Sequence, residues 1–133
     1  MLHKVLIDKE KAKSMLKMAI NRQEAINSIK IDYPTIIAEN YYEIIKELSS
    51  ALLLLEGLKA IGENSHKEII DNLEKFNKFS SYEISLLQDL RIKRNKSQYE
   101  GEPFDVSYLK NKKEILLKII DKLKKEVKDR LCL

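Results

Sequence analysis

The late segment DLRIKRNKSQYEGEP holds the side chains of this chain that are best suited to bind an anion. On a helix that turns by ~100° per residue, Arg91, Asn95 and Tyr99 fall on one line at steps of four residues. Arg94 lies one residue step from that line, so two guanidinium groups, an amide and a phenol share one sector. Guanidinium groups bind phosphate oxygens through a rigid fork of donors, and a phenol can stack on a base or transfer a proton. The spacing therefore permits a face that binds phosphate groups.

Positive charge is concentrated around the same residues. The net charge is +4 with a pI near 9.0, and residues 91–96 carry four positive charges and no negative one, Lys96 among them. A second basic region, residues 110–130, carries nine positive and four negative charges. This distribution favours a phosphate-bearing partner. The alternative interpretation is that the second region is the solvated face of an amphipathic helix, and that Arg91 and Arg94 pair with surface acids.

Other familiar kinds of site are missing from the sequence. The two histidines, His3 and His66, do not form the Glu-x-x-His or His-Glu-x-x-His spacing of a metal site, and Cys132 is the one cysteine. No glycine-rich phosphate loop or nucleophile elbow occurs. We therefore expect no metal and no cofactor, and we interpret His66 as an exposed surface residue.

The sequence also predicts where the protein works. No stretch is long and apolar enough to span a membrane, and the first residues lack the apolar centre and cleavage site of a signal peptide. A single cysteine fits a reducing compartment. We therefore expect a cytoplasmic protein without a membrane partner.

Five helical segments are expected to position the anion-binding face. With 44% hydrophobic and 35% charged residues but three glycines and two prolines, the composition is that of a helix-rich globular protein. Apolar residues recur at three- and four-residue steps in the segments. The predicted helices are residues 9–29, residues 35–61, a short helix that starts at Ser65, a helix from Ser80 to about Tyr99, and residues 105–130.

Capping residues and helix breakers set these boundaries. The expected starts are Asp8, Pro34, a capping box of Ser65 with Glu68, a second capping box of Ser80 with Glu83, and Asp105. The expected stops are Gly62 and the turn of Gly101 and Pro103. No run alternates apolar and polar residues for long enough to predict a strand.

The order of these elements predicts an all-α fold, an antiparallel up-and-down four-helix bundle with an extra short helix. A chain of 133 residues has the usual size of one domain. In the second helix the apolar run of residues 51–55 indicates a central position. Apolar residues from Ile37 to Leu58 recur in steps of four and three, which predicts a seam for antiparallel or dimeric packing.

Three stretches of the chain resemble HEPN domains, the helical bundles named for nucleotide binding in higher eukaryotes and prokaryotes. Arg94-Asn95-x-x-x-Tyr99 is similar to their Arg-Asn-x-x-x-His motif, with Tyr99 at the histidine position. Residues 39–70, ENYYEIIKELSSALLLLEGLKAIGENSHKEII, are similar to their long second helix and its Gly-x-x-Ser-His-Lys exit. Residues 99–105, YEGEPFD, resemble their Tyr-Glu-Gly turn into the final helix.

The resemblance implies a HEPN-like protein that binds RNA or a nucleotide through Arg91, Arg94, Asn95, Lys96 and Tyr99. Members with the full motif are metal-independent RNases, commonly the toxin half of a toxin–antitoxin pair with a small nucleotidyltransferase, and usually homodimers. In such a member Arg94 would steady the phosphate charge, Asn95 would orient the phosphate, and Tyr99 would replace the histidine in proton transfer. A phenol with a pKa of ~10 is ionised in about one molecule per thousand at neutral pH. The tyrosine therefore implies weak or lost RNase activity.

Two alternatives stay open at this point. The chain can be a non-catalytic helical interaction module in which the Ile37–Leu58 seam and the motif helix serve dimerisation and partner binding. It can also be an active metal-independent RNase that uses Arg94 and Tyr99. Which acid of the second helix approaches the motif is open too, and the candidates are Glu43, Glu47 and Glu56.

Overall fold

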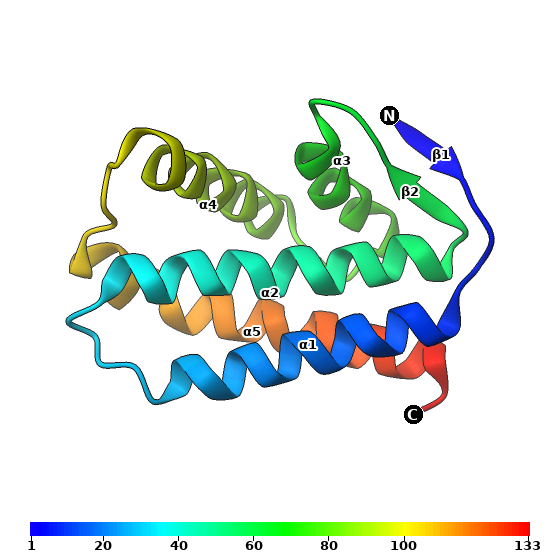
Figure 1. Cartoon of the computed structure of the whole chain (residues 1–133), viewed down its shortest axis with the longest axis horizontal. Coiled ribbons are helices and arrows are strands. Elements are labelled where there is room, and N and C mark those ends of the chain that lie inside the picture. The colour runs from blue at the N-terminus through cyan, green and yellow to red at the C-terminus, as the bar shows by residue number, and fades with distance from the viewer.

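Five α-helices, one short 3₁₀ helix and two strands of 3 residues each make up the computed structural model, which describes residues 1–133 (Figure 1). In chain order they are β1 (Leu2–Lys4), α1 (Lys9–Asn27), α2 (Pro34–Leu55), β2 (Leu58–Ala60), α3 (Ser65–Asp71), the 3₁₀ helix η1 (Asn72–Phe76), α4 (Ser81–Glu100) and α5 (Val106–Leu131). The predicted all-α helical bundle is confirmed.

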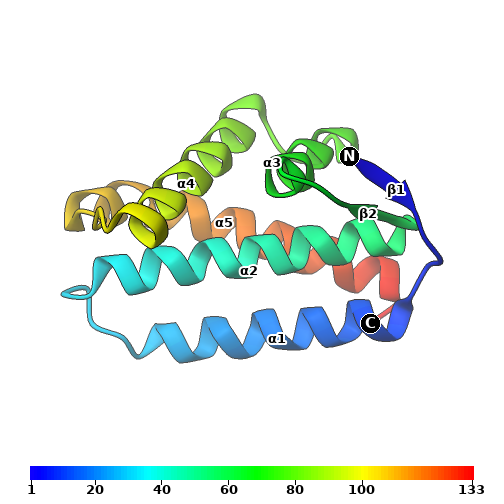
Figure 2. The same cartoon turned by 45° about the horizontal axis from the view of Figure 1, so that its top comes forward.

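Helix α2 lies at the centre of the bundle and contacts each of the other four α-helices. α1 and α5 run alongside it, whereas α3 and α4 lie on another side and α4 crosses it obliquely (Figures 1 and 2). α1, α2, α4 and α5 alternate in direction, as in an up-and-down bundle. The central position agrees with the apolar run of residues 51–55, which offers hydrophobic surface on nearly every side of α2.

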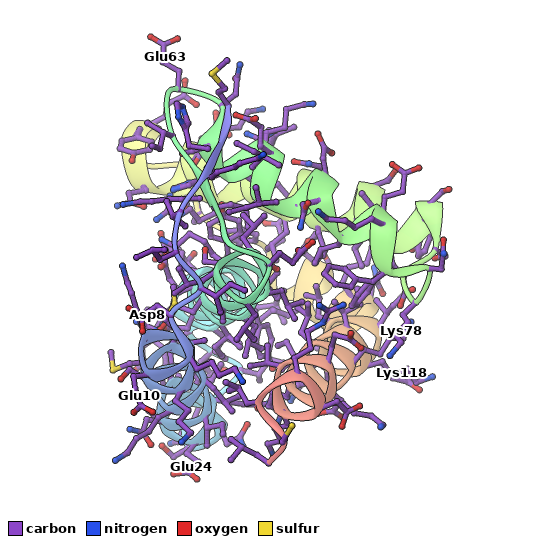
Figure 3. The ribbon with its side chains drawn as sticks, turned by 90° about the vertical axis from the view of Figure 1, so that its right-hand side faces the viewer. Asp8, Glu10, Glu24, Glu63, Lys78 and Lys118 are labelled. Atoms are coloured by element: carbon purple, nitrogen blue, oxygen red, sulfur yellow. The ribbon has the colours of Figure 1, made fainter.

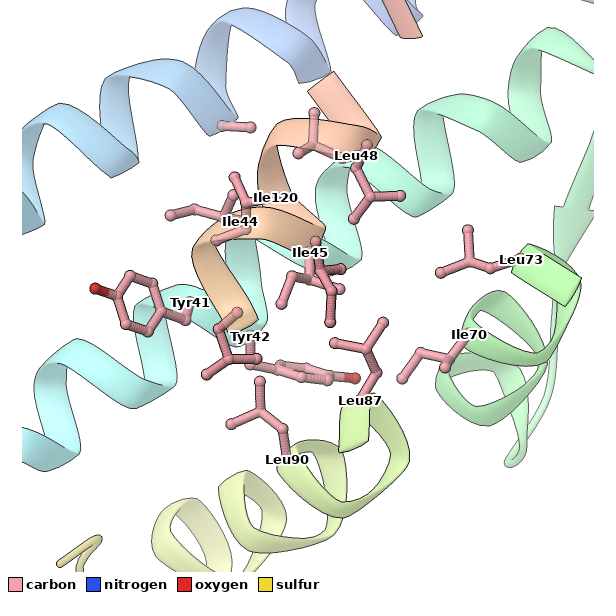
Figure 4. Close-up of a cluster of buried hydrophobic side chains, with 14 of the residues drawn as sticks. Tyr41, Tyr42, Ile44, Ile45, Leu48, Ile70, Leu73, Leu87, Leu90 and Ile120 are labelled. Carbon is pink, nitrogen blue, oxygen red and sulfur yellow. The ribbon is translucent and has the colours of Figure 1, made fainter. Parts of the chain in front are cut away.

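Buried apolar side chains from several helices form one continuous core (Figure 4). Ile44, Ile45 and Leu48 of α2 are fully buried. Leu87 from α4 and Ile120 from α5 approach them from different sides. Burial of a side chain of this size stabilises the fold by about 1.5–3 kcal/mol, so the helices are held mainly by their contacts with α2.

The apolar seam predicted from Ile37 to Leu58 packs inside the chain. Its members from Ile37 to Ala51 are at most 6% exposed, and Leu58 lies outside the helix in β2. α1 and α2 share the most extensive helix interface of the bundle. The seam therefore serves antiparallel packing within one chain, and its buried members from Ile37 to Ala51 leave no surface there for dimeric packing.

Charged side chains cover the outside of the bundle (Figure 3). Glu10 and Glu24 of α1 project on one side, and Lys118 of α5 projects on another. Several lysines of α5 pair with acids on the same helix or on α4, among them Lys122 with Glu83. Much of the basic region of residues 110–130 is accordingly a solvated helix face.

Capping explains where two of the helices begin. The side chain of Asp8 accepts a hydrogen bond from the backbone N–H of Lys11 at 3.0 Å and starts α1. At α4 both bonds of the capping box form, because Ser80 Oγ accepts from the N–H of Glu83 and the Glu83 carboxylate accepts from the N–H of Ser80. Both predicted caps are confirmed.

The start of α3 differs from the predicted capping box of Ser65 with Glu68. Ser65 is the first residue of the helix, Asn64 precedes it, and no side chain caps the helix. Glu68 instead forms an ion pair with the amino group of Met1. The physical reason is that β1 brings the N-terminal ammonium next to α3, where it attracts this carboxylate.

The end of α2 also differs from the prediction. The helix stops at Leu55, and Gly57 rather than Gly62 turns the chain, with a φ of +73° in the left-handed region that favours glycine. The chain then forms β2, which pairs antiparallel with β1 so that Leu2 lies opposite Ala60. Strands this short show no alternating pattern, so the sequence analysis missed this sheet.

Gly57→Ala is expected to lower the free energy of unfolding more than Gly101→Ala does. The two glycines have φ values of +73° and +72°, so the left-handed backbone costs each variant about the same, on the order of 1–2 kcal/mol. A Cβ at Gly57 would lie 3.0 Å from the carbonyl oxygen of Val5, whereas a Cβ at Gly101 meets no atom within 4 Å. Urea denaturation of both variants measures the difference, and equal losses would show that the contact with Val5 is easily relieved.

Candidate functional site

Arg94 turns into the bundle and is only 7% exposed. Its Nη2 donates a hydrogen bond to Oε1 of Glu43 at 2.7 Å, and its Nη1 donates to Oδ1 of Asn95 at 3.2 Å. Its guanidinium carbon lies 5.1 Å from the centre of the Tyr42 ring, within the range of a cation–π contact. The arginine therefore links α4 to α2 and does not present its donors freely to solvent.

Arg91 and Asn95 are half-buried beside Arg94 on α4. Arg91 Nε donates to the side-chain oxygen of Gln88 at 2.7 Å. The amide of Gln88 in turn donates to Asp71 at 2.8 Å and to the backbone oxygen of Lys67 at 3.0 Å, both on α3. These bonds connect α4 to α3 and hold Arg91 near the place where the two helices meet.

Lys96 and Tyr99 lie apart from this group. Lys96 is exposed and lines a separate hollow of about 140 Å³ with Lys93 and Tyr108, next to α5. Tyr99 is 73% exposed and extends into solvent, although its phenol still contributes to the electrostatic environment of Tyr42. Of the predicted face, the structure thus brings Arg91, Arg94 and Asn95 together and leaves Lys96 and Tyr99 outside.

One of the three acids of α2 joins the group. Glu43 binds Arg94 through Oε1 and Lys46 through Oε2, the latter at 2.8 Å. The other two acids are engaged elsewhere, Glu47 with Arg22, and Glu56 with Asn72 and Lys75. Of the three candidate acids, Glu43 is therefore the one that approaches the motif residues.

His66 of α3 also faces this group, which the sequence analysis did not anticipate. The histidine is half-buried rather than exposed, and its ring centre lies 6.3 Å from that of Tyr42. His66 is partly covered because α3 packs against both α2 and α4 and turns its second residue toward them. The Gly-x-x-Ser-His-Lys stretch carried a signal for this residue, but it gave no information on which helices α3 would contact.

We name these residues the Arg94 cluster; its members are Tyr42, Glu43, Lys46, His66, Arg91, Arg94 and Asn95. They come from α2, α3 and α4. Figure 4 shows the Tyr42 ring beside Leu87 and Leu90, with its oxygen on the side of Ile70. The hydroxyl is buried and has no hydrogen-bond partner.

Burial and the surrounding charges shift the pKa values of Tyr42, His66 and Glu43. Burial raises the pKa of Tyr42 to about 12, although Arg94 and Arg91 oppose the shift. Burial and the positive charges of Lys46 and Arg94 lower the pKa of His66, with Glu43 opposing them, so the imidazole is mainly neutral at pH 7.

Glu43 is the ionised partner within the cluster. Burial disfavours its charge, but hydrogen bonds and charge from Lys46 and Arg94 outweigh burial and hold its pKa below the ordinary 4.5. A carboxylate with a lowered folded-state pKa contributes stability that is present above the ordinary value and lost as the pH falls through the lowered one. The cluster is therefore intact at neutral pH and loses its negative charge only in acid.

Comparisons with protein-family models, curated proteins and solved structures found no match to this chain. No group of three or more His, Cys, Asp or Glu side chains is arranged to hold a metal ion. None of the helices combines the length and the apolar composition that crossing a bilayer requires.

Arg94→Ala is expected to lower the free energy of unfolding by about 2 kcal/mol, because it removes a buried guanidinium that bonds Glu43 and packs on the Tyr42 ring, and leaves Glu43 with Lys46 alone. Lys118→Ala is the control, since Lys118 pairs with Glu114 on the outside of α5, where the two side chains are 70% and 89% exposed. A loss of about 1 kcal/mol or less is expected there. Urea denaturation at neutral pH compares the two, and equal losses would contradict a structural role for the Arg94 pair.

Proposed function

We propose that this protein binds RNA or a nucleotide through the Arg94 cluster, as a HEPN-like protein with weak or lost RNase activity. The observation that carries the proposal is an excess of positive charge where three helices meet. Lys46 and Arg94 flank one carboxylate, that of Glu43, and both act with Arg91 on the neighbouring His66. Uncompensated positive charge beside solvent attracts phosphate groups and strengthens their binding.

The cationic residues of the cluster have different roles in this proposal. Arg94 is buried and bonded to Glu43, so it supplies positive potential and holds the cluster together. Arg91 is half-exposed, and the side chain of Lys46 is 25% exposed, so a phosphate can reach both. Asn95 accepts from Arg94 through its oxygen, which leaves its amide N–H groups to donate to a phosphate or a base.

Tyr99 fits base stacking better than proton transfer. Its exposed ring offers a flat surface on which a base of single-stranded RNA can stack, a contact worth about 1–3 kcal/mol. Arg94 is engaged with Glu43, and Tyr99 lies outside that contact. This geometry supports binding over catalysis by an Arg94 and Tyr99 pair.

The resemblance to HEPN domains supports the same proposal. It rests on the Arg94-Asn95-x-x-x-Tyr99 segment and on the order of the elements around it. We extend the proposal to the setting that the resemblance implies, a cytoplasmic, toxin-like protein that acts as a homodimer with a small nucleotidyltransferase. Binding of RNA by the purified chain is the part of this proposal that can be tested first.

Arg91→Gln and Lys46→Gln are each expected to weaken the binding of single-stranded RNA about tenfold, because each removes one charge-assisted phosphate contact. Each is also expected to reduce the slope of log affinity against log salt concentration by about one. Fluorescence anisotropy of a labelled oligonucleotide across a salt series measures both quantities.

Lys118→Gln is the matched control for these variants. It removes the same charge from the outer face of α5, where the side chain is 70% exposed (Figure 3). An equal loss in this control would indicate general attraction to a basic protein. Absence of RNA binding by the parent at ~0.1 M salt would contradict the proposal itself.

Self-association through α4 is a second candidate function. Ile92 and Tyr99 are 45% and 73% exposed, and they lie seven residues apart, so both project from the same side of the helix. Exposed apolar side chains at this spacing favour a contact with another helix. In this candidate the chain is a non-catalytic interaction module, and α4 replaces the predicted seam as its contact surface.

Ile92→Glu is expected to shift the chain from a dimer to a monomer of 15.6 kDa if α4 forms the contact, because a charge would enter an apolar interface. Sedimentation equilibrium of the parent and the variant measures the mass. Met18→Glu is the control, since Met18 is 53% exposed on α1. A parent that already sediments as a monomer would exclude this candidate.

A further inference from the structure

The ring of Tyr42 brings a histidine and an arginine from two different helices to one place. The centre of the ring lies 6.3 Å from that of His66 on α3 and 5.1 Å from the guanidinium carbon of Arg94 on α4. His66 is half-buried, so the residue keeps some contact with solvent while its ring lies next to Tyr42. The imidazole is thus held where a phosphate bound by Arg91 or Lys46 would lie next to it.

We propose that His66 is a phosphate-binding residue of the Arg94 cluster that takes up a proton when an RNA phosphate binds. This inference rests on the proposed function, because it needs a phosphate to bind at the cluster. It adds a residue that the Arg-Asn-x-x-x-Tyr segment does not contain. It also makes the affinity for RNA depend on pH.

The charged groups around His66 determine whether its imidazole carries a proton. Those on the neighbouring elements are Lys46, Glu43 and the phenol Tyr42 of α2, and Arg91 and Arg94 of α4. The adjacent charges on α3 itself are already paired, Lys67 with Asp71, and Glu68 with the N-terminal ammonium. Three cations and one carboxylate therefore face the imidazole, and a proton on it is repelled more than it is attracted.

An RNA phosphate offsets part of this repulsion. Burial and the nearby cations lower the pKa of His66 in the free protein, so the imidazole is mainly neutral at pH 7. A phosphodiester carries one negative charge, and its arrival beside His66 favours the imidazolium and raises the pKa of the group. Because the bound state then holds more protons than the free state, affinity increases as the pH falls through the interval between the two pKa values.

A purely structural role for His66 would give pH effects of the opposite sign. A histidine whose pKa is lowered by folding contributes stability that is fully present above its ordinary value of 6.5 and lost as the pH falls. Acidification would thus weaken the fold while it strengthens RNA binding. The two effects can be measured separately on the same protein.

The test uses an oligouridylate that ends in hydroxyl groups, since its phosphodiesters do not titrate near neutral pH. Its dissociation constant is measured by fluorescence anisotropy at constant ionic strength from about pH 8 to about pH 5.5, with circular dichroism as a check of folding. We expect the parent to bind about tenfold more tightly at the lower pH, which corresponds to a pKa change of about one unit on binding.

Three variants separate His66 from other causes of pH dependence. His66→Asn cannot take up the proton and should bind independently of pH, with the weaker affinity that the parent shows at high pH. His66→Lys carries a permanent charge and should bind tightly at every pH. His3→Asn removes the other histidine, which is exposed on β1, and should behave like the parent.

Two outcomes would overturn the inference while leaving the proposed function in place. These are salt-dependent RNA binding by the parent that does not change with pH, and a pH dependence that survives in His66→Asn. If the parent binds no RNA at any pH, the proposed function fails, and the role of His66 as a phosphate-binding residue fails with it.

Discussion

The burial of α2 is the constraint on which the rest of the structure depends. Its apolar side chains face every direction, and four other α-helices have to surround it to remove them from water. A helix covered in this way can hold polar residues only where its neighbours leave room. Glu43 and Lys46 occupy such a position where α3 and α4 meet over α2, and Arg94 can be buried there because Glu43 is available to pair with it.

Periodicity and capping were sufficient to predict most of the helical framework. The Ser80 and Glu83 capping box and the αL glycine Gly101 bound α4 as expected, because these signals act within a few residues of each other. The errors at Gly57 and at the start of α3 have a different origin. Both involve the N-terminal segment, which lies far away in sequence, and local patterns carry no information about such contacts.

The candidate site shows the same division between local and distant information. Helical geometry correctly grouped Arg91 with Asn95, but it could not tell which side of α4 faces the core, so the burial of Arg94 was missed. The Arg94 pair with Glu43 spans 51 residues, and the approach of His66 depends on how α3 docks. His66, which is absent from the motif in sequence, thus approaches the same Tyr42 ring that the motif arginine contacts.

The pairing of β1 with β2 has a consequence for the order in which the elements form. It joins residues 2–4 to residues 58–60, so α1 and α2 lie within one long loop that the sheet closes. Closing a loop costs conformational entropy before its contacts can repay it. We expect the packing of α1 on α2 to bring the two strands together, so that the sheet forms after the helix pair and not before it.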